Sequence, residues 1–379
     1  MSNQNKKDQL QKLMNKFCKD HDLDSTTMGF MSENKTLGVI KHISTGNIGI
    51  DAITNNGIIE GKVNIIYGGE NSCKSTLALD LVAERQRKDP EFIAAICDNE
   101  KVFDRIYAES KGIDLSRLWL SPAFNEAEQA YDFCNEAATS GLVDMLIVDT
   151  IQALASKGEI VTKKGKKKST EDDTMALIPR LLSQFLRMYT SQTTGTVTLI
   201  LLSQVRIDLG GQGMIKSAKK TGGKAIDHYN ILTLKLTKFS ILGTGNWPHA
   251  IASQAEAPPK SFPVQVRIDK AKMQGRFDGN KIMIYFYKGQ FEHKFNVLAI
   301  AKDLGMHDGK LLKYKKEFED SHGKDCEIEE EFKAKGFKDM YNRVPDEAIS
   351  YLASRIIDKY GESINEELAP NDEPEEEQK

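Results

Sequence analysis

The sequence predicts an α/β protein built on a large, mostly parallel sheet with helices on both faces. Three observations support this class. Between about residues 39 and 240, short apolar runs alternate with segments of helical periodicity. These runs are apolar at most positions, as expected for parallel strands that are buried on both sides. A glycine-rich turn follows the first run directly, and acidic residues follow the next two.

The elements follow one another in a regular order along the chain. Residues 4–20 place Leu10, Leu13, Met14 and Phe17 at helical spacing, which predicts an amphipathic helix that docks on the protein's own core or on a neighbouring subunit. The strands expected in the sheet are residues 63–67, 92–97, 145–148, 197–202 and 231–236. The helices expected between them include residues 76–88, 126–140 and 177–189.

The pattern changes after about residue 240. Residues 264–269 and 281–287 are typical of hairpin strands, with turn signals at Gly275 and Asp278-Gly279 between them. Residues 295–360 are highly charged and helical in pattern, which predicts a small α-rich C-terminal domain. The domains expected are an N-terminal helical arm (1–38), a core (39–293), a small C-terminal domain (294–361) and a disordered acidic tail (362–379).

The composition limits the class of protein. Of 379 residues, 40% are hydrophobic and 28% are charged, which is ordinary for a soluble globular protein. No apolar run approaches the roughly 18 residues of a membrane-spanning helix, so we expect no membrane partner. The polar N-terminus shows no secretory signal, and five scattered cysteines favour reduced thiols in a cytoplasmic protein.

The net charge of −3 hides a segregation of charge. Two short segments concentrate lysines, whereas residues 362–377 are strongly acidic. This distribution predicts binding of a polyanion, with a tail that competes for it, although either lysine run alone is more typical of a solvated loop. The lysines are Lys163, Lys164, Lys166, Lys167 and Lys168 in the first segment, and Lys216, Lys219, Lys220 and Lys224 in the second.

The turn after residues 63–67 has the layout of a phosphate-binding P-loop. It ends in Lys74-Ser75 and continues into a helical segment, so backbone N–H groups and the helix N-terminus can cradle phosphates. Lys74 would neutralise the phosphates and the Ser75 hydroxyl would bind Mg²⁺, while Cys73 stands where the usual pattern has a second glycine. The loop comprises Gly68, Gly69, Glu70, Asn71, Ser72, Cys73, Lys74, Ser75 and Thr76.

Nucleotide hydrolysis also needs a carboxylate near the metal, a group that activates water and a sensor of the γ-phosphate. Asp149 follows a strand at the sheet edge where open α/β sheets bind ligands, so we assign it to Mg²⁺ rather than to a helix N-cap. Glu100 follows another strand at this edge and suits activation of water, with Asp98 as the competing candidate. Gln204 directly follows the expected strand at residues 198–203. Either its amide contacts the γ-phosphate, or the residue merely begins a loop.

Together these blocks resemble the RecA recombinases. The matching blocks are Ile43-Ser44-Thr45-Gly46, the P-loop, residues 97–107, residues 147–150 and Thr221-Gly222-Gly223, in the order and near the spacing of that family. The similarity covers roughly residues 40–290 and is strongest over 43–155. The non-glycine residue in the P-loop is similar to divergent phage members of the UvsX type.

The resemblance implies ATP and Mg²⁺ as ligands and an α/β P-loop ATPase core as the fold. Asp104 and Tyr107 match positions that hold the adenine. Glu100 matches the catalytic glutamate, and Gln204 matches the glutamine that couples the γ-phosphate to a DNA-binding loop.

The resemblance also implies an interface between subunits. Lys270 and Lys272 are similar to paired lysines that reach the ATP of the neighbouring subunit; without the resemblance they are simply the solvated side of a strand. Besides Cys73, three positions depart from the family pattern, namely Asp208, Asp227 and His228. These departures concern the coupling between nucleotide and DNA rather than the fold.

Two segments resemble the DNA-binding loops of the family. The first spans residues 157–175 with the helix after it, and the second spans residues 205–221. Lysines and arginines would contact phosphates, two apolar residues would wedge between bases, and glycines would keep the second loop mobile. The DNA-binding residues are Lys163, Lys164, Lys166, Lys167, Lys168, Met175, Arg180, Arg187, Arg206, Leu209, Gly210, Gly211, Lys216, Lys219, Lys220, Thr221, Gly222 and Gly223.

The resulting hypothesis is a DNA-dependent ATPase that forms ATP-regulated helical filaments on single-stranded DNA. It would pair that strand with homologous double-stranded DNA and exchange strands in recombination and repair. Expected partners are further copies of the chain, a single-stranded-DNA-binding protein and mediator proteins, in the cytoplasm of a bacterial or phage-infected cell. The alternatives are a ring motor, such as a helicase or KaiC-like ATPase, and a DNA-coating protein in which Cys73 has abolished hydrolysis.

Overall fold

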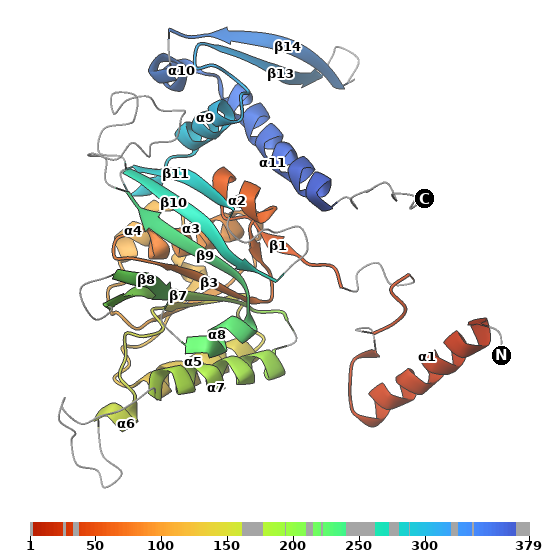
Figure 1. Ribbon diagram of the computed structural model, residues 1–379. Coiled ribbons are helices and arrows are strands. Elements are labelled where there is room, and N and C mark those ends of the chain that lie inside the picture. The colour runs from red at the N-terminus through yellow and green to blue at the C-terminus, as the bar shows by residue number, and fades with distance from the viewer. Residues whose placement is uncertain are drawn as a thin grey trace, which may run out of the picture. The chain divides into compact units, whose positions relative to one another are not determined.

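The computed structural model describes residues 3–25, 28–32, 38–160, 177–193, 195–209, 215–220, 223–239, 262–272, 280–287, 289–319, 325–335 and 337–368. It divides into two compact units, Met1–Lys41 and His42–Lys379. The first unit contains α1 (Asn3–Asp20), the helix predicted at residues 4–20 (Figure 1). Leu10, Leu13 and Phe17 are exposed by 46%, 59% and 49%, so the apolar stripe of α1 is largely accessible.

The second unit is organised around a ten-stranded sheet in the order β12-β11-β10-β9-β3-β7-β6-β4-β5, with β8 paired to β7. Strands β9, β3, β7, β6, β4 and β5 run parallel, and β10 to β12 continue the sheet antiparallel. All five predicted strands are confirmed, as β3, β4, β6, β7 and β9. The strands are β3 (Val63–Gly68), β4 (Ala94–Asp98), β5 (Leu118–Leu120), β6 (Met145–Asp149), β7 (Thr198–Leu209), β8 (Ile215–Lys220), β9 (Asn230–Lys238), β10 (Phe262–Ala271), β11 (Lys281–Tyr287) and β12 (Gln290–Phe291).

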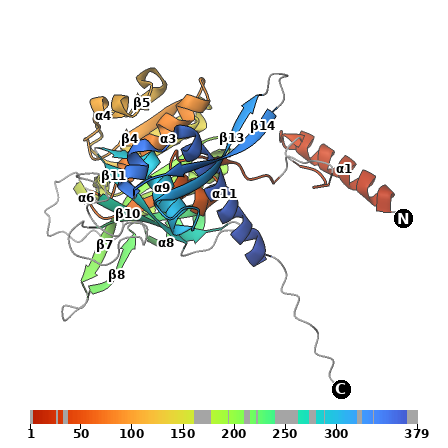
Figure 2. The same cartoon turned by 90° about the horizontal axis from the view of Figure 1, so that it is seen from above.

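Helices cover both faces of this sheet (Figures 1 and 2). Successive residues of a strand point to opposite faces, so β3, β4, β6 and β7 each contribute to two separate cores. Ile66 and Ile147 pack in the core with α2 and α3, whereas Ile65 and Val148 pack in the core with α5 and α7. The helices are α2 (Ile48–Thr54), α3 (Lys74–Lys88), α4 (Arg105–Ser110), α5 (Ala127–Thr139), α6 (Lys157–Ile160), α7 (Leu177–Gln192) and α8 (Gly223–Tyr229).

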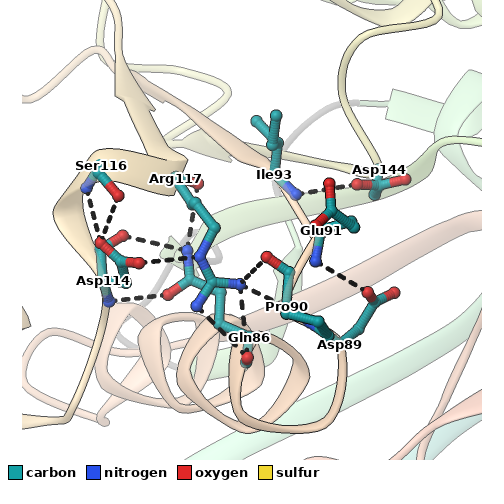
Figure 3. A network of polar contacts seen from close by, with 9 residues as sticks. All are labelled: Gln86, Asp89, Pro90, Glu91, Ile93, Asp114, Ser116, Arg117 and Asp144. Atoms are coloured by element: carbon teal, nitrogen blue, oxygen red, sulfur yellow. Dashed lines mark hydrogen bonds and ion pairs between the residues drawn. The ribbon is translucent and has the colours of Figure 1, made fainter.

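A polar network fastens the connection between α4 and β5 to the end of α3 (Figure 3). The Arg117 guanidinium donates to the carbonyl oxygens of Asp89 and Pro90, both at 3.0 Å, and to the Asp114 carboxylate at 2.9 Å. Gln86 on α3 accepts a hydrogen bond from the Asp114 backbone N–H at 2.9 Å. These bonds hold the segment after α4 against α3.

The C-terminal part of the chain contains a long hairpin that we did not expect. The charged composition predicted helices throughout, but in the hairpin the charges face one another across strands, with Lys313 Nζ 3.2 Å from Glu331 Oε1. On the other face Leu312 and Tyr314 are buried, which is the period of a strand. The expected boundary between the core and the C-terminal domain, at residues 293/294, stays a prediction. The elements are α9 (His293–Asp303), β13 (Leu311–Glu319), β14 (Asp325–Lys333), α10 (Phe337–Arg343) and α11 (Asp346–Leu368).

The second of the expected DNA-binding loops is also partly a hairpin. Strand β7 continues to Leu209 and pairs antiparallel with β8. The turn signals at residues 275–279 and the end of the acidic tail, 369–379, lie outside the described residues. None of the described helices is long and apolar enough to cross a membrane. The cysteines whose side chains are described, Cys18, Cys73, Cys97 and Cys134, are free, as the sequence predicted.

Candidate active site

The P-loop joins the end of β3 to the first turn of α3. A Cβ atom at Gly68 would lie 2.3 Å from the Leu236 carbonyl oxygen and 2.5 Å from Ser72 Oγ, so the chain needs glycine there. Cys73 directly precedes α3 and has φ 67° and ψ 28°, in the left-handed region. The backbone therefore has a conformation that glycine adopts readily, with a cysteine in its place.

The Lys74 side chain folds back over the P-loop. Its Nζ donates to the carbonyl oxygens of Gly69 at 2.8 Å and Gly68 at 3.3 Å. Burial lowers the pKa of Lys74, and the nearby carboxylates of Asp149 and Glu100 oppose that shift. Phosphate oxygens are stronger acceptors than carbonyl oxygens, so a bound phosphate can take over this ammonium group.

Parallel pairing brings the predicted polar residues to one edge of the sheet. Gly68 at the end of β3 is the cross-strand partner of Gln204 in β7. Asp98 at the end of β4 is the partner of Asp149 at the end of β6. The P-loop, the carboxylates and Gln204 thus meet where open α/β sheets bind their ligands.

Ser75 and Asp149 form a pair suited to a divalent cation. Ser75 Oγ donates to Asp149 Oδ2 at 2.6 Å. Burial raises the pKa of Asp149 to about 6, with Glu100 and Asp98 adding to the shift and Ser75 and Lys74 opposing it. Mg²⁺ prefers oxygen ligands and is commonly held by one or two protein groups plus phosphate and water. The Ser75 hydroxyl and the Asp149 carboxylate supply two oxygen ligands of this kind, and the described residues contain no group of three or more His, Cys, Asp or Glu that could hold a metal.

Glu100 and Gln204 are in direct contact. Gln204 Nε2 donates to Glu100 Oε1 at 3.1 Å. The Glu100 backbone N–H donates to the Asp149 carbonyl oxygen at 3.3 Å, which ties the glutamate to β6. By contrast, the Asp98 carboxylate accepts hydrogen bonds of 2.8 and 2.9 Å from backbone amides within residues 101–103. Of the two competing carboxylates, Glu100 is the one beside Gln204.

Glu100, Asp149 and Gln204 line a cleft of about 650 Å³ together with the loop from Glu70 to Thr76. It also contains four residues that the sequence did not single out, namely Thr150, Lys238, Phe262 and Phe286. The rings of Phe262 and Phe286 lie with centroids 4.9 Å apart, and Lys238 Nζ lies 4.1 Å from the Phe262 centroid. Lys238 ends β9, so the strand-end rule that found Gln204 could have found it. Thr150 ends the matching block 147–150, whereas no local motif marks Phe262 or Phe286.

Tyr107 and Asp104 lie beside the P-loop helix, next to a small cavity. Asp104 Oδ1 caps α4 by accepting from the Tyr107 N–H at 3.0 Å. The Tyr107 hydroxyl lies 3.0 Å from Thr76 Oγ1 and donates to the Gly289 carbonyl oxygen at 2.6 Å. A cavity of about 110 Å³ is lined by Asp104 and Tyr107 and extends to Ser75. This arrangement connects the predicted adenine residues to the phosphate site.

Lys270 and Lys272 are not among the residues that line the 650 Å³ cleft. Lys270 Nζ contacts the Asp227 carbonyl oxygen and lies 3.2 Å from Asn230 Oδ1. Lys272 Nζ contacts the His228 carbonyl oxygen. Both ammonium groups therefore lie at the C-terminal end of α8, where the helix dipole favours cations. Their role toward a neighbouring subunit stays a prediction.

The predicted DNA-binding residues are described only in part. Arg180 and Arg187 are exposed on α7, while Leu182, Phe185 and Leu186 face the core. The backbone at Arg206 pairs with Lys219 in the hairpin of β7 and β8, which also contains Leu209, Lys216 and Lys220, and Gly223 begins α8. The predicted residues outside the described part are Lys163, Lys164, Lys166, Lys167, Lys168, Met175, Gly210, Gly211, Thr221 and Gly222.

The fold and the site define a class: a P-loop protein with a mixed, mostly parallel sheet and the polar groups of nucleotide chemistry at one sheet edge. The family model for the RecA N-terminal domain matches residues 9–290. The chain therefore belongs to the RecA family. This confirms the family named from the sequence blocks.

Relatives named "Protein RecA" match the chain at moderate identity. The protein from a Nitratiruptor species is 36% identical over 219 residues, which cover 56% of this chain and 60% of that protein. The protein from Campylobacter fetus subsp. fetus is 35% identical over 57% of this chain and 60% of its own length. The protein from Wigglesworthia glossinidia brevipalpis is 34% identical over 64% and 70%, respectively. The chain thus spans about 60% of the length of the first two relatives.

Proposed function

We propose that this protein is a DNA-dependent ATPase that forms filaments on single-stranded DNA and exchanges that strand with a homologous duplex. The observation that carries the proposal is the meeting of the P-loop, the Ser75–Asp149 pair and the Glu100–Gln204 contact at one sheet edge. Membership of the RecA family supports the same activity.

The P-loop residues would bind the phosphates of ATP. Backbone N–H groups at the start of α3 and the Lys74 ammonium would face the phosphate oxygens. Ser75 and Asp149 would hold Mg²⁺, which when bound neutralises charge on those oxygens. The nucleobase would lie toward Tyr107 and Asp104, which line the adjoining small cavity.

Glu100 would act as the general base. Its carboxylate takes a proton from water as the water oxygen attacks the γ-phosphorus, and the bond from phosphorus to the bridging oxygen of ADP breaks. In the described state this carboxylate accepts a hydrogen bond from Gln204. A γ-phosphate offers the Gln204 amide a charged acceptor that competes with this carboxylate, so ATP would draw Gln204 away and release Glu100 for catalysis.

Gln204 would also link the nucleotide to DNA. It belongs to β7, which continues without interruption into the hairpin that contains Lys216, Lys219 and Lys220. Movement of Gln204 would therefore shift the strand that presents this basic hairpin. Together with Arg180 and Arg187 on α7, the hairpin would contact DNA phosphates, with affinity that falls as salt rises.

The remaining expectations concern assembly. The apolar stripe of α1 would dock on another copy of the chain, and Lys270 and Lys272 would reach the nucleotide of a neighbouring copy. The acidic tail would compete with duplex DNA for basic surfaces. A single-stranded-DNA-binding protein and a mediator would act as partners, in the cytoplasm. Cys73 in the P-loop supports a place in a divergent, phage-type branch of the family.

Hydrolysis of ATP by the purified protein, with and without single-stranded DNA, tests this function. We expect DNA to raise the rate sharply and Lys74→Ala to abolish it. Lys62→Ala is the matched control, because Lys62 is an exposed lysine at the opposite end of β3 and should leave the rate unchanged. Intact DNA binding without hydrolysis would overturn the proposal in favour of a coating protein, and closed rings in electron micrographs would favour a ring motor.

A further inference from the structure

A buried ion pair lies directly beside Tyr107. Lys111 follows α4 and Asp80 lies on α3, and Lys111 Nζ is 2.6 Å from Asp80 Oδ1. The Lys111 side chain is only 2% exposed and that of Asp80 is 24% exposed. The same ammonium group lies over the Tyr107 ring, 5.2 Å from its centroid.

Stability alone is a poor explanation for this pair. Taking two charges out of water costs about as much as their attraction returns, so a well-packed apolar pair is often at least as stable. In agreement, burial raises the pKa of Asp80 and the attraction of Lys111 only opposes that shift. The pair is better explained by the group that it holds in place.

Tyr107 is the group held in place. Its hydroxyl is bonded to the P-loop helix at Thr76 and to the backbone at Gly289. Gly289 packs so closely that an added Cβ would lie 3.3 Å from Tyr107 Cε2. The hydroxyl and one edge of the ring are thus fixed, and Lys111 fixes one face.

We propose that Asp80 and Lys111 are positioning residues for the purine base of the nucleotide, a role that rests on the function proposed above. Asp80 holds the Lys111 ammonium against one face of the Tyr107 ring, which leaves the other face for the base. A cation on one face draws electron density from the ring. An electron-rich purine then stacks more strongly on the free face than it would on an unpolarised, mobile tyrosine.

The test compares ATP with inorganic tripolyphosphate, which has the phosphates but no base. The double variant Asp80→Asn/Lys111→Met removes both charges at similar volume, so no unpaired charge stays buried. Tyr107→Ala gives the full loss of the stacking surface, and thermal unfolding checks the fold of each variant. By calorimetric titration in the presence of Mg²⁺, we expect the Kd for ATP to rise about tenfold in the double variant. The Kd for tripolyphosphate should change by less than about twofold, because it has no base to stack on Tyr107.

Two results would overturn the positioning role: an unchanged Kd for ATP, or an equal loss for ATP and tripolyphosphate, which would indicate a purely structural pair. Wild-type protein that binds neither ligand would instead overturn the proposed function itself. If the double variant unfolds, Asp80→Asn/Lys111→Gln replaces it, since a neutral hydrogen bond can then join the two side chains. The same rise in the Kd for ATP is expected, because this variant also removes the cation from the ring.

Discussion

At position 73 we expect a glycine variant to be more stable than an alanine variant, the reverse of the usual order inside a helix. At φ 67° a residue with a Cβ atom pays for the left-handed conformation with about 1–2 kcal/mol. Glycine avoids this cost but lowers stability by about 0.4–1 kcal/mol, because its unfolded chain has more freedom to lose. Cys73→Gly and Cys73→Ala both lose the thiol and its packing, so that loss cancels. The difference leaves Cys73→Gly more stable than Cys73→Ala by roughly 0.5–1 kcal/mol.

Urea unfolding followed by far-ultraviolet circular dichroism measures this difference, with all variants in one buffer. Ala83→Gly is the matched control, because Ala83 lies inside α3, ten residues along the same P-loop helix. There the same exchange of alanine for glycine should lower the free energy of unfolding by about 1 kcal/mol. The opposite sign at position 73 would support the argument. If Cys73→Ala is more stable than Cys73→Gly, the left-handed conformation does not carry the cost that we assign to it.

The remaining predictions concern catalysis, packing, pH and DNA. Glu100→Gln should lower turnover by about 10²–10⁴-fold with little change in the Kd for ATP, measured by single-turnover hydrolysis; an equal loss of affinity would argue against a general base. Thr150 Oγ1 is buried without a hydrogen-bond partner among the described residues, so the free energy of unfolding of Thr150→Val in urea should match or exceed that of the wild type by up to about 1 kcal/mol, with Thr150→Ser as control. Burial lowers the pKa of His307, whose Nδ1 accepts from the Gly309 N–H at 3.0 Å. The contribution of neutral His307 to stability is therefore complete above the pKa of histidine in the unfolded chain, about 6.5, and is lost as pH falls. The urea midpoint of His307→Asn should therefore decline less than that of the wild type between about pH 7 and 5. Arg187→Ala should weaken single-stranded DNA binding and reduce the slope of log K against log salt by about 0.7, whereas an unchanged slope would exclude a phosphate contact.

The parallel core was predictable because its signals are local. Apolar runs that end in Gly68, Asp98 and Asp149 mark both the strands and the edge at which their ends meet. Parallel pairing then places these ends together without any knowledge of the rest of the fold. The Ser75–Asp149 and Glu100–Gln204 contacts bring together residues that were singled out from the P-loop pattern and from strand ends, and their roles stay predictions.

The parts that escaped prediction depend on pairing between distant segments. Phe262 and Phe286 enter the cleft because β10 and β11 pair in a register that places them opposite each other, and nothing in either segment marks that register. The Lys111–Asp80 pair likewise joins residues 31 positions apart, one directly after α4 and the other on α3. The hairpin of β13 and β14 was missed for another reason: its apolar residues alternate, but lysine and glutamate dominate both strands and are usually read as exposed helix.

The uninterrupted course of β7 has a mechanical consequence. Its first half is clamped between β3 and β6 inside the sheet, and its second half extends past Gln204 into the hairpin with β8. A strand clamped at one end acts as a cantilever, so a small rotation at Gln204 would be enlarged toward the hairpin tip, apart from what the shift in pairing register between Arg206 and Asp208 absorbs. The stiffness of β7, rather than the ordering of a flexible loop, would then determine how closely the position of the DNA-binding hairpin follows the state of the bound nucleotide. Inserting two glycines immediately after Gln204 would leave the nucleotide site and the hairpin chemically intact but would uncouple their movements.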